Sequence, residues 1–167
     1  MNISELKTCL NNINEVDLDK LKSIILSYSE IIILGNGGSN AISSHISQDY
    51  TKTLNKRAIS FSDSSRLTCY INDYGMDMAY VKFIEHFSNK NTLVILISSS
   101  GNSSNIINSA RHCLHNNIDI ITLSGFDRNN KLNSIYGHKM PLLSFWIDSK
   151  DYGIVECLHE IILHSVI

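Results

Sequence analysis

Residues 31–39 read IIILGNGGS, an apolar run followed by a turn that contains three glycines and ends in a serine. The apolar run over 31–34 predicts a buried strand, because it is short and rich in β-branched residues. The glycines permit a tight turn with positive φ angles and the close approach of a ligand. Ser39 can cap a helix that begins directly after the turn, where free N–H groups favour an anion. This order is typical of an α/β fold.

A second loop of the same kind follows the apolar run 93–97. It reads SSSGNSS over residues 98–104 and leads straight into a predicted helix. A capping turn needs one hydroxyl, so the excess of serines around one glycine favours anion binding without a lysine. The first loop alone is ambiguous, since its spacing is neither that of dinucleotide sites nor that of the P-loop. In an open parallel sheet, both loops lie at the carboxyl ends of strands, where ligands bind.

The rest of the chain alternates between short apolar runs and amphipathic stretches of helical period. The predicted strands are 31–34, 58–62, 93–97, 118–123 and 142–147. The predicted helices of the core are 39–54, 76–88, 103–116 and 154–167. This order predicts an α/β fold with three layers, in which a doubly wound, five-stranded parallel sheet is flanked by helices.

The segment before the first strand, residues 1–29, has apolar residues at helical spacing on both sides of residues 11–14. It predicts one broken helix or two shorter ones, placed outside an α/β core of residues 30–167. The length of 167 residues and the lack of a linker predict one domain, 1–167. A small sheet covered by its own helices need not bury the apolar residues of this segment. We therefore expect a second subunit to cover them, in a homo-oligomer.

The composition excludes several classes of protein. Hydrophobic residues make up 43% of the chain, charged residues 18%, and the net charge of -2 offers no positive field for nucleic acid. The four cysteines lie far apart without a CxxC pair, which fits buried thiols better than disulfides or a zinc knuckle. No signal-peptide pattern and no apolar run of bilayer length occur. We expect a cytoplasmic protein that binds neither nucleic acid nor a membrane.

Two predicted helices carry histidines and carboxylates. His45 and Asp49 are four residues apart on the helix after the first loop, so they share a face. The last helix carries Glu156, His159 and His164. From the residues alone, His45 and Asp49 fit an exposed pair better than a base in a site. A lone histidine on an apolar helix is usually a hydrogen-bonded core residue, an interpretation that suits His159 more than His164.

Three segments, taken in order, resemble the motifs of a known family. They are residues 35–39 (GNGGS), 72–75 (NDYG) and 98–103 (SSSGNS). They are similar to motifs of sugar isomerase (SIS) domains, specifically of the phosphoheptose isomerases, and the resemblance spans nearly the whole chain. It implies the SIS fold, a homotetramer, and an aldose–ketose isomerase. The implied reaction converts sedoheptulose 7-phosphate to D-glycero-D-manno-heptose 7-phosphate through an enediolate.

The resemblance also implies which residues bind the sugar phosphate. The phosphate is expected on the serines of both loops, with Ser99 standing where the family often has threonine. The full set of implied contacts is Asn36, Gly37, Gly38, Ser39, Asp73, Ser98, Ser99, Ser100, Asn102, Ser103, Asp151 and Glu156. Tyr152 replaces the usual small hydroxyl residue beside Asp151, so the choice of sugar stays open.

For catalysis, the resemblance implies Asp49 as the base that moves a carbon-bound proton and His164 as the group that moves protons at the oxygens. It further implies zinc or a similar divalent ion, held by a nitrogen and oxygen set of His45, Asp49, Glu156 and His164. The sequence departs from the family at Asp49, where glutamate is usual, and at Glu156, where glutamine is usual. Glu156 and His164 are about 12 Å apart along a helix, which makes a shared ion difficult.

Two other functions remain open at this point. A non-catalytic SIS protein, used for sensing a sugar phosphate or for protein association, would share the fold. The shortened carboxylate of Asp49 and the acidic Glu156 favour this alternative, whereas the retention of a carboxylate and a histidine at the two chemical positions favours the enzyme. The third alternative is an isomerase of another ketose phosphate.

Overall fold

The structure is a computed structural model that describes residues 1–167. Its centre is a parallel sheet with the strand order β2-β1-β3-β4-β5. The strands are β1 Glu30–Leu34, β2 Arg57–Ser60, β3 Thr92–Ser98, β4 Asp119–Gly125 and β5 Leu143–Ile147. The helices are α1 Ile3–Asn11, α2 Glu15–Ser27, α3 Gly38–Leu54, α4 Ser64–Tyr74, α5 Met76–Phe87, α6 Ser104–His115 and α7 Tyr152–His164. The predicted five-stranded parallel sheet is confirmed.

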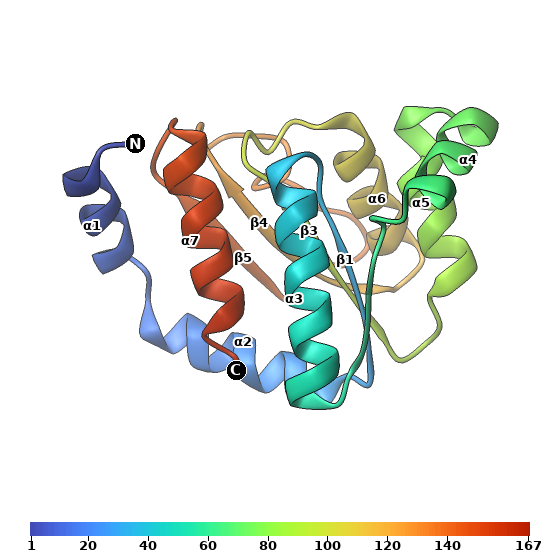
Figure 1. Ribbon diagram of the computed structural model, residues 1–167, viewed down its shortest axis with the longest axis horizontal. Coiled ribbons are helices and arrows are strands. Elements are labelled where there is room, and N and C mark those ends of the chain that lie inside the picture. The colour runs from blue at the N-terminus through green and yellow to red at the C-terminus, as the bar shows by residue number, and fades with distance from the viewer.

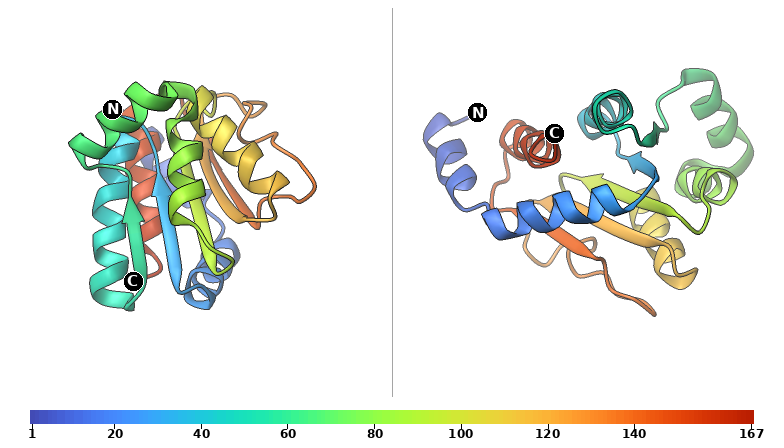
Figure 2. Two further views of the ribbon diagram at one scale, coloured as in Figure 1. Left: turned by 90° about the vertical axis from the view of Figure 1, so that its right-hand side faces the viewer. Right: turned by 90° about the horizontal axis from the view of Figure 1, so that it is seen from below.

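Helices cover both faces of the sheet. On one face, α2, α3 and α7 pack against the odd-numbered residues of β1, such as Ile31 and Ile33. On the other face, α5 and α6 pack against Ile32 and Leu34. Figure 2 shows α3 and α7 on one side of the sheet and α6 on the other. Successive strand residues point to opposite faces, so a strand buried on both sides is apolar throughout. The doubly wound arrangement is confirmed.

The strand order places the two predicted loops next to each other. β1 has β2 on one side and β3 on the other, so the chain reverses its direction of winding between β1 and β3. Ligands bind at such a switch point, outside the carboxyl ends of the strands. The loop that leads from β1 to α3 and the loop that leads from β3 to α6 flank this crevice.

Helices α3 and α7 lie side by side and begin at the same edge of the sheet (Figure 1). Both follow strands of one parallel sheet, so they run in the same direction. The buried hydroxyl of Tyr50 on α3 donates a hydrogen bond of 2.8 Å to the carbonyl of Leu163 on α7. This bond ties the carboxyl-terminal halves of the two helices together.

The predicted strands and helices begin and end within about three residues of those in the structure. One helix was omitted. The N-terminal segment breaks into α1 and α2, and Asn14 caps α2 by accepting a hydrogen bond from the N–H of Val16. Helix α4 was not predicted. Asp63 caps it, and Leu67, Tyr70, Ile71 and Tyr74 recur at helical spacing, a signal that the sequence analysis did not use.

The cysteines agree only in part with the expectation that all four are buried, unpaired thiols. All four cysteines are free, but only Cys9 and Cys113 are buried. The expectation of buried thiols is therefore wrong for Cys69 and Cys157, which lie exposed on α4 and α7. No helix is long and apolar enough to cross a membrane.

His159 is a core residue, as the sequence favours. It is completely buried in α7, and its Nε2 lies 3.1 Å from the carbonyl oxygen of Ser124. A carbonyl only accepts, so Nε2 carries the proton. Burial, opposed in part by this hydrogen bond, lowers the pKa of His159 from 6.5 to about 4.

This buried histidine predicts a loss of stability in mild acid. Between pH 6.5 and about 4 the unfolded chain binds a proton at residue 159 that the folded chain does not. The contribution of His159 to the free energy of unfolding is therefore fully present above pH 6.5, and it falls by up to about 3 kcal/mol as the pH drops to about 4. Urea unfolding of wild type and His159→Gln at both pH values measures the difference. Parallel pH dependence in the two proteins would contradict it.

Candidate active site

The two predicted loops line one cavity of about 280 Å³ at the switch point. Residues from the β1–α3 loop, the β3–α6 loop and the start of α7 surround it. They are Asn36, Gly37, Gly38, Ser39, Ile97, Ser98, Ser99, Ser100, Ser103, Tyr152 and Glu156. Most of the sugar-phosphate contacts implied by the sequence therefore lie around one cavity.

Three helices begin at this cavity, and two of them, α3 and α6, have no side-chain cap at the N-terminus. Gly37, with φ of 54°, occupies the N-cap position of α3 and has no side chain to cap it. The expectation that Ser39 caps this helix is wrong, since Ser39 lies inside its first turn. Ser103 at the N-cap of α6 makes no side-chain capping bond, and its Oγ lies 3.2 Å from Ser98 Oγ. Free N–H groups at two helix starts favour an anion.

One hydroxyl in this cavity has no hydrogen-bond partner in the protein. Ser99 is 5% exposed, and its Oγ is a buried polar atom without a partner. Leaving such a group unpaired costs about 1–3 kcal/mol. An acceptor oxygen in the cavity would satisfy it, so the donor set fits an oxyanion.

A reciprocal pair of amides holds the two loops in register. Asn36 Nδ2 donates to Asn105 Oδ1, and Asn105 Nδ2 donates to Asn36 Oδ1, each at 2.9 Å. The hydroxyl of Tyr80 also donates to Asn36 Oδ1, at 3.0 Å. Gly101 has φ of 65°, and a Cβ there would collide with the side chain of Asn130. The cavity is thus held in shape before any ligand enters.

The carboxylate of Glu156 lies at the edge of the cavity. It rests so close to Gly38 that a Cβ on that glycine would collide with it. Partial burial raises the pKa of Glu156 above its ordinary value. A negative charge beside an anion cavity opposes anion binding. This position is one of the two at which the sequence departs from the implied family pattern.

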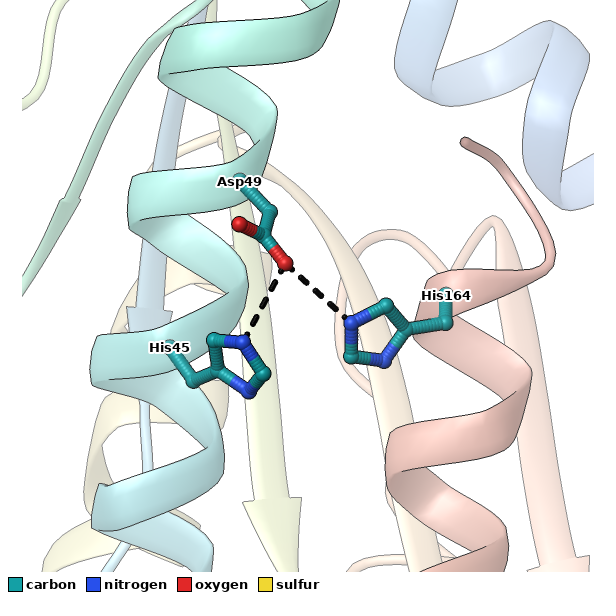
Figure 3. Close-up of side chains that lie close together, drawn as sticks. All are labelled: His45, Asp49 and His164. Atoms are coloured by element: carbon teal, nitrogen blue, oxygen red, sulfur yellow. Dashed lines mark hydrogen bonds and ion pairs between the residues drawn. The ribbon is translucent and has the colours of Figure 1, made fainter.

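His45, Asp49 and His164 form a second cluster further along α3 and α7 (Figure 3). Asp49 Oδ2 lies 3.3 Å from Nε2 of His45 and 3.2 Å from Nε2 of His164. One ligand atom from each residue lies within 4.8 Å of the other two. Two imidazole nitrogens and a carboxylate oxygen are a suitable set for zinc or a similar ion.

A groove between α3 and α7 joins the cluster to the cavity. It has a volume of about 430 Å³ and shares Gly38 and Glu156 with the cavity and His45 with the cluster. His45 is seven residues after Gly38, a distance of about 10 Å along the helix axis. The cavity and the cluster therefore lie at opposite ends of this groove, with the Glu156 carboxylate between the groove and the cavity.

Three predicted sugar-phosphate contacts lie apart from the cavity, and one predicted metal ligand, Glu156, lies apart from the cluster. Glu156 is not among the cluster residues, because its carboxylate lies at the cavity end of α7. Asp73 accepts a hydrogen bond from Asn72 Nδ2 at 2.9 Å on exposed α4. Asp151 caps α7 by accepting a hydrogen bond from the N–H of Gly153 at 2.7 Å. Asn102 is exposed and accepts a hydrogen bond from the N–H of Lys131. In this conformation Asp73, Asn102 and Asp151 support local structure.

The sequence analysis missed one residue that contacts the cluster, Glu160. Its Oε1 lies 2.8 Å from Nδ1 of His45, and its backbone carbonyl lies 3.1 Å from Nδ1 of His164. The sequence feature that could have identified Glu160 is its spacing from His164, since the two are four residues apart on one face of α7.

Comparison with known proteins identifies the family. A phosphoheptose isomerase of Fusobacterium nucleatum is 33% identical to this chain over an alignment of 153 positions, which covers 89% of this chain and 76% of that protein. The chain belongs to the phosphoheptose isomerase family. A phosphoheptose isomerase of Cytophaga hutchinsonii is 28% identical, over 89% of this chain and 78% of that protein. No protein-family model matches the sequence.

The structures of phosphoheptose isomerases have the same fold. The enzyme GmhA of Neisseria gonorrhoeae superposes with a TM-score of 0.82 at 23% identity, over 96% of this chain and 88% of that chain. The family expected from the three sequence motifs is confirmed, together with its fold.

The cavity predicts opposite effects of two changes on phosphate affinity. Ser98→Ala combined with Ser100→Ala removes two hydroxyl donors and should weaken binding by about 2 kcal/mol, or about thirtyfold. Glu156→Gln removes a negative charge at matched size and should strengthen binding by about fivefold. Calorimetry with inorganic phosphate measures both. Equal affinity in all three proteins would show that phosphate does not occupy this cavity.

Proposed function

We propose that this protein is an aldose–ketose isomerase that converts sedoheptulose 7-phosphate to D-glycero-D-manno-heptose 7-phosphate. The observation that carries the proposal is the groove that shares Glu156 with the serine-lined cavity and reaches His45, whose Nε2 lies 3.3 Å from Asp49. Membership of the phosphoheptose isomerase family supports the same reaction. The serine loops anchor the phosphate and the groove directs the other end of the sugar toward the cluster, which makes the reaction effectively intramolecular.

The proton transfers fall to two residues. Asp49 takes a proton from C1 of the ketose, which forms the enediolate, and returns it to C2 to give the aldose. His164 takes the proton from the C1 hydroxyl and supplies one to the oxygen on C2. The two side chains are in contact at 3.2 Å, on helices that Tyr50 ties together. No atom is gained or lost overall, as an isomerisation requires.

Asp49 is one methylene shorter than the glutamate implied by the family resemblance. Proton transfer needs near hydrogen-bond reach, so a withdrawn carboxylate would be slow. In this chain the carboxylate reaches both His45 and His164, and its side chain is 22% exposed. These contacts support a role for Asp49 despite its length.

The residues also fit a divalent ion such as zinc. His45, Asp49 and His164 would hold it, since they offer two nitrogens and one oxygen within 4.8 Å. When bound, such an ion polarises oxygens of a substrate. Glu156, the fourth ligand predicted from the sequence, lies at the cavity end of the groove, so we assign it to the sugar-phosphate contacts. Three protein ligands leave coordination positions open, as in catalytic metal sites.

Catalysis is tested by exchange of the carbon-bound proton. Asp49→Asn and His164→Gln should each reduce exchange between sedoheptulose 7-phosphate and deuterated water by at least about a hundredfold, because each removes a proton carrier. Phosphate affinity should stay within about twofold, since neither residue lines the cavity. NMR measures the exchange, and His115→Gln on α6 is the control.

Two outcomes would replace the proposal. Wild-type protein that binds the sugar phosphate but shows neither exchange nor product would make the protein a non-catalytic binder. Exchange with another ketose phosphate alone would change the substrate and leave the roles of the residues in place.

We also propose that the protein is cytoplasmic and forms a homo-oligomer, with four subunits as the family resemblance implies. Apolar side chains are exposed on the outer faces of α1, α2 and α7. They are Ile3, Leu10, Val16, Leu26 and Ile161. Burial of such residues between subunits would stabilise an assembly by about 25 cal/mol per Å² of apolar surface.

Light scattering tests the assembly. Wild-type protein at micromolar concentration should have about four times the chain mass of 18.8 kDa. Ile3→Asp together with Leu10→Asp should lower the mass, because α1 would then place charges in the contact. Tyr136→Asp, at a residue that is 77% exposed and away from these helices, is the control. A wild-type mass of one chain would contradict the proposal.

A further inference from the structure

Glu160 on α7 makes two different contacts with the cluster. Its side chain Oε1 lies 2.8 Å from Nδ1 of His45, across the groove on α3. Its backbone carbonyl lies 3.1 Å from Nδ1 of His164, one turn further along α7. Glu160 therefore contacts the Nδ1 atom of each of the two histidines.

The contact with His164 fixes the position of a proton. A backbone carbonyl has no hydrogen to give, so Nδ1 of His164 must be the donor. The neutral ring then has its lone pair on Nε2. That atom lies 3.2 Å from Asp49 Oδ2. Nε2 of His164 is thus the ring atom that faces Asp49, and its lone pair is the one open to a cation that replaces the proton between them.

The contact with His45 has the same effect through a side chain. The Glu160 carboxylate accepts a hydrogen bond from Nδ1–H, and Nε2 of His45 faces Asp49 Oδ2 at 3.3 Å. The side chain of His45 is 54% exposed, so packing alone does not fix its ring. Glu160 supplies the constraint that burial does not.

We propose that Glu160 is a positioning residue of the cluster, which engages Nδ1 of both histidines so that their Nε2 atoms, beside Asp49, are the ones left to bind a cation. A histidine that binds a metal commonly donates its other N–H to a carboxylate or a backbone carbonyl, and Glu160 provides one of each. This inference rests on the proposed metal-binding role of the cluster. It gives Glu160 a function distinct from that of Glu156, one turn earlier on α7, which faces the phosphate cavity.

The two halves of this role respond differently to mutation. Replacing Glu160 removes the partner of His45, whereas the backbone carbonyl that holds His164 remains. The effect on stability should be small, because an ion pair between side chains that are 54% and 38% exposed contributes about 0–1 kcal/mol. Alanine is also the best helix former. Folded protein is therefore available for the test.

The first test reads the histidine tautomers without metal. Long-range ¹H–¹⁵N NMR at about pH 8.5, where histidines are ordinarily neutral, distinguishes protonation at Nδ1 from protonation at Nε2. We expect Nδ1–H for His45 and His164 in wild type. In Glu160→Ala, His45 should lose the Nδ1–H form while His164 keeps it. Glu160→Gln, whose amide oxygen still accepts, should retain it in both.

The second test measures affinity for Co²⁺ by competition with a coloured chelator, using the whole protein. Glu160→Ala should bind Co²⁺ about 10–100 times more weakly than wild type, and Glu160→Gln should recover most of the loss. The matched control is Glu85→Ala, which removes a carboxylate 3.8 Å from Nδ1 of His112, outside the cluster. Its Co²⁺ affinity and the tautomer of His45 should equal those of wild type.

Unchanged His45 tautomer or unchanged Co²⁺ affinity in Glu160→Ala would overturn the inference, as would wild-type protein that binds no Co²⁺. A change in both, restored by glutamine, supports it. Neither measurement uses the isomerase reaction. Failure of the proton-exchange test in a protein that passes both would remove the proposed reaction and leave the positioning role intact.

Discussion

The parallel packing of α3 against α7 is the constraint on which the site depends. Both helices follow strands of one parallel sheet, so both begin at the edge where the loops gather. Their first turns surround the cavity and their later turns carry the cluster. The hydrogen bond from Tyr50 to Leu163 fixes the two helices at the far end. Without this alignment, His45 and His164, which are separated by 119 positions in the sequence, would not share a partner.

The two departures from the family pattern lie at opposite ends of this helix pair. Glu156 adds a negative charge beside the cavity, and Asp49 shortens the carboxylate in the cluster. Glu160 then adds a second carboxylate on the other side of His45. The groove therefore carries several acidic groups next to the cavity that we propose for phosphate. The uncapped helix N-termini and the serine hydroxyls provide the opposing attraction.

The fold could be predicted from the sequence because its signals are local. The central strands β1, β3 and β4 are short apolar runs, and each loop of the cavity follows directly from a strand. Helix α4 was predictable by the same local signal, since Leu67 and Ile71 lie at helical spacing and pack against the core. Glu160 was missed for a physical reason. Its partner His45 is 115 positions away, and only the packing of α3 on α7 brings the two together. Whether Glu156 faces the cavity or the cluster likewise depends on how α7 packs. The spacing of residues along one helix does not determine this.

Under the proposed function, the distance between the cavity and the cluster lets the groove select substrates by their length. A ligand anchored by its phosphate must cover about 10 Å along α3 before its far end meets His45. A three-carbon sugar phosphate is too short to touch both ends, whereas an extended chain of six or seven carbons can. Selection by length needs no contact with individual hydroxyl groups. The spacing of two anchor points on rigid helices can thus sort substrates before any chemistry begins.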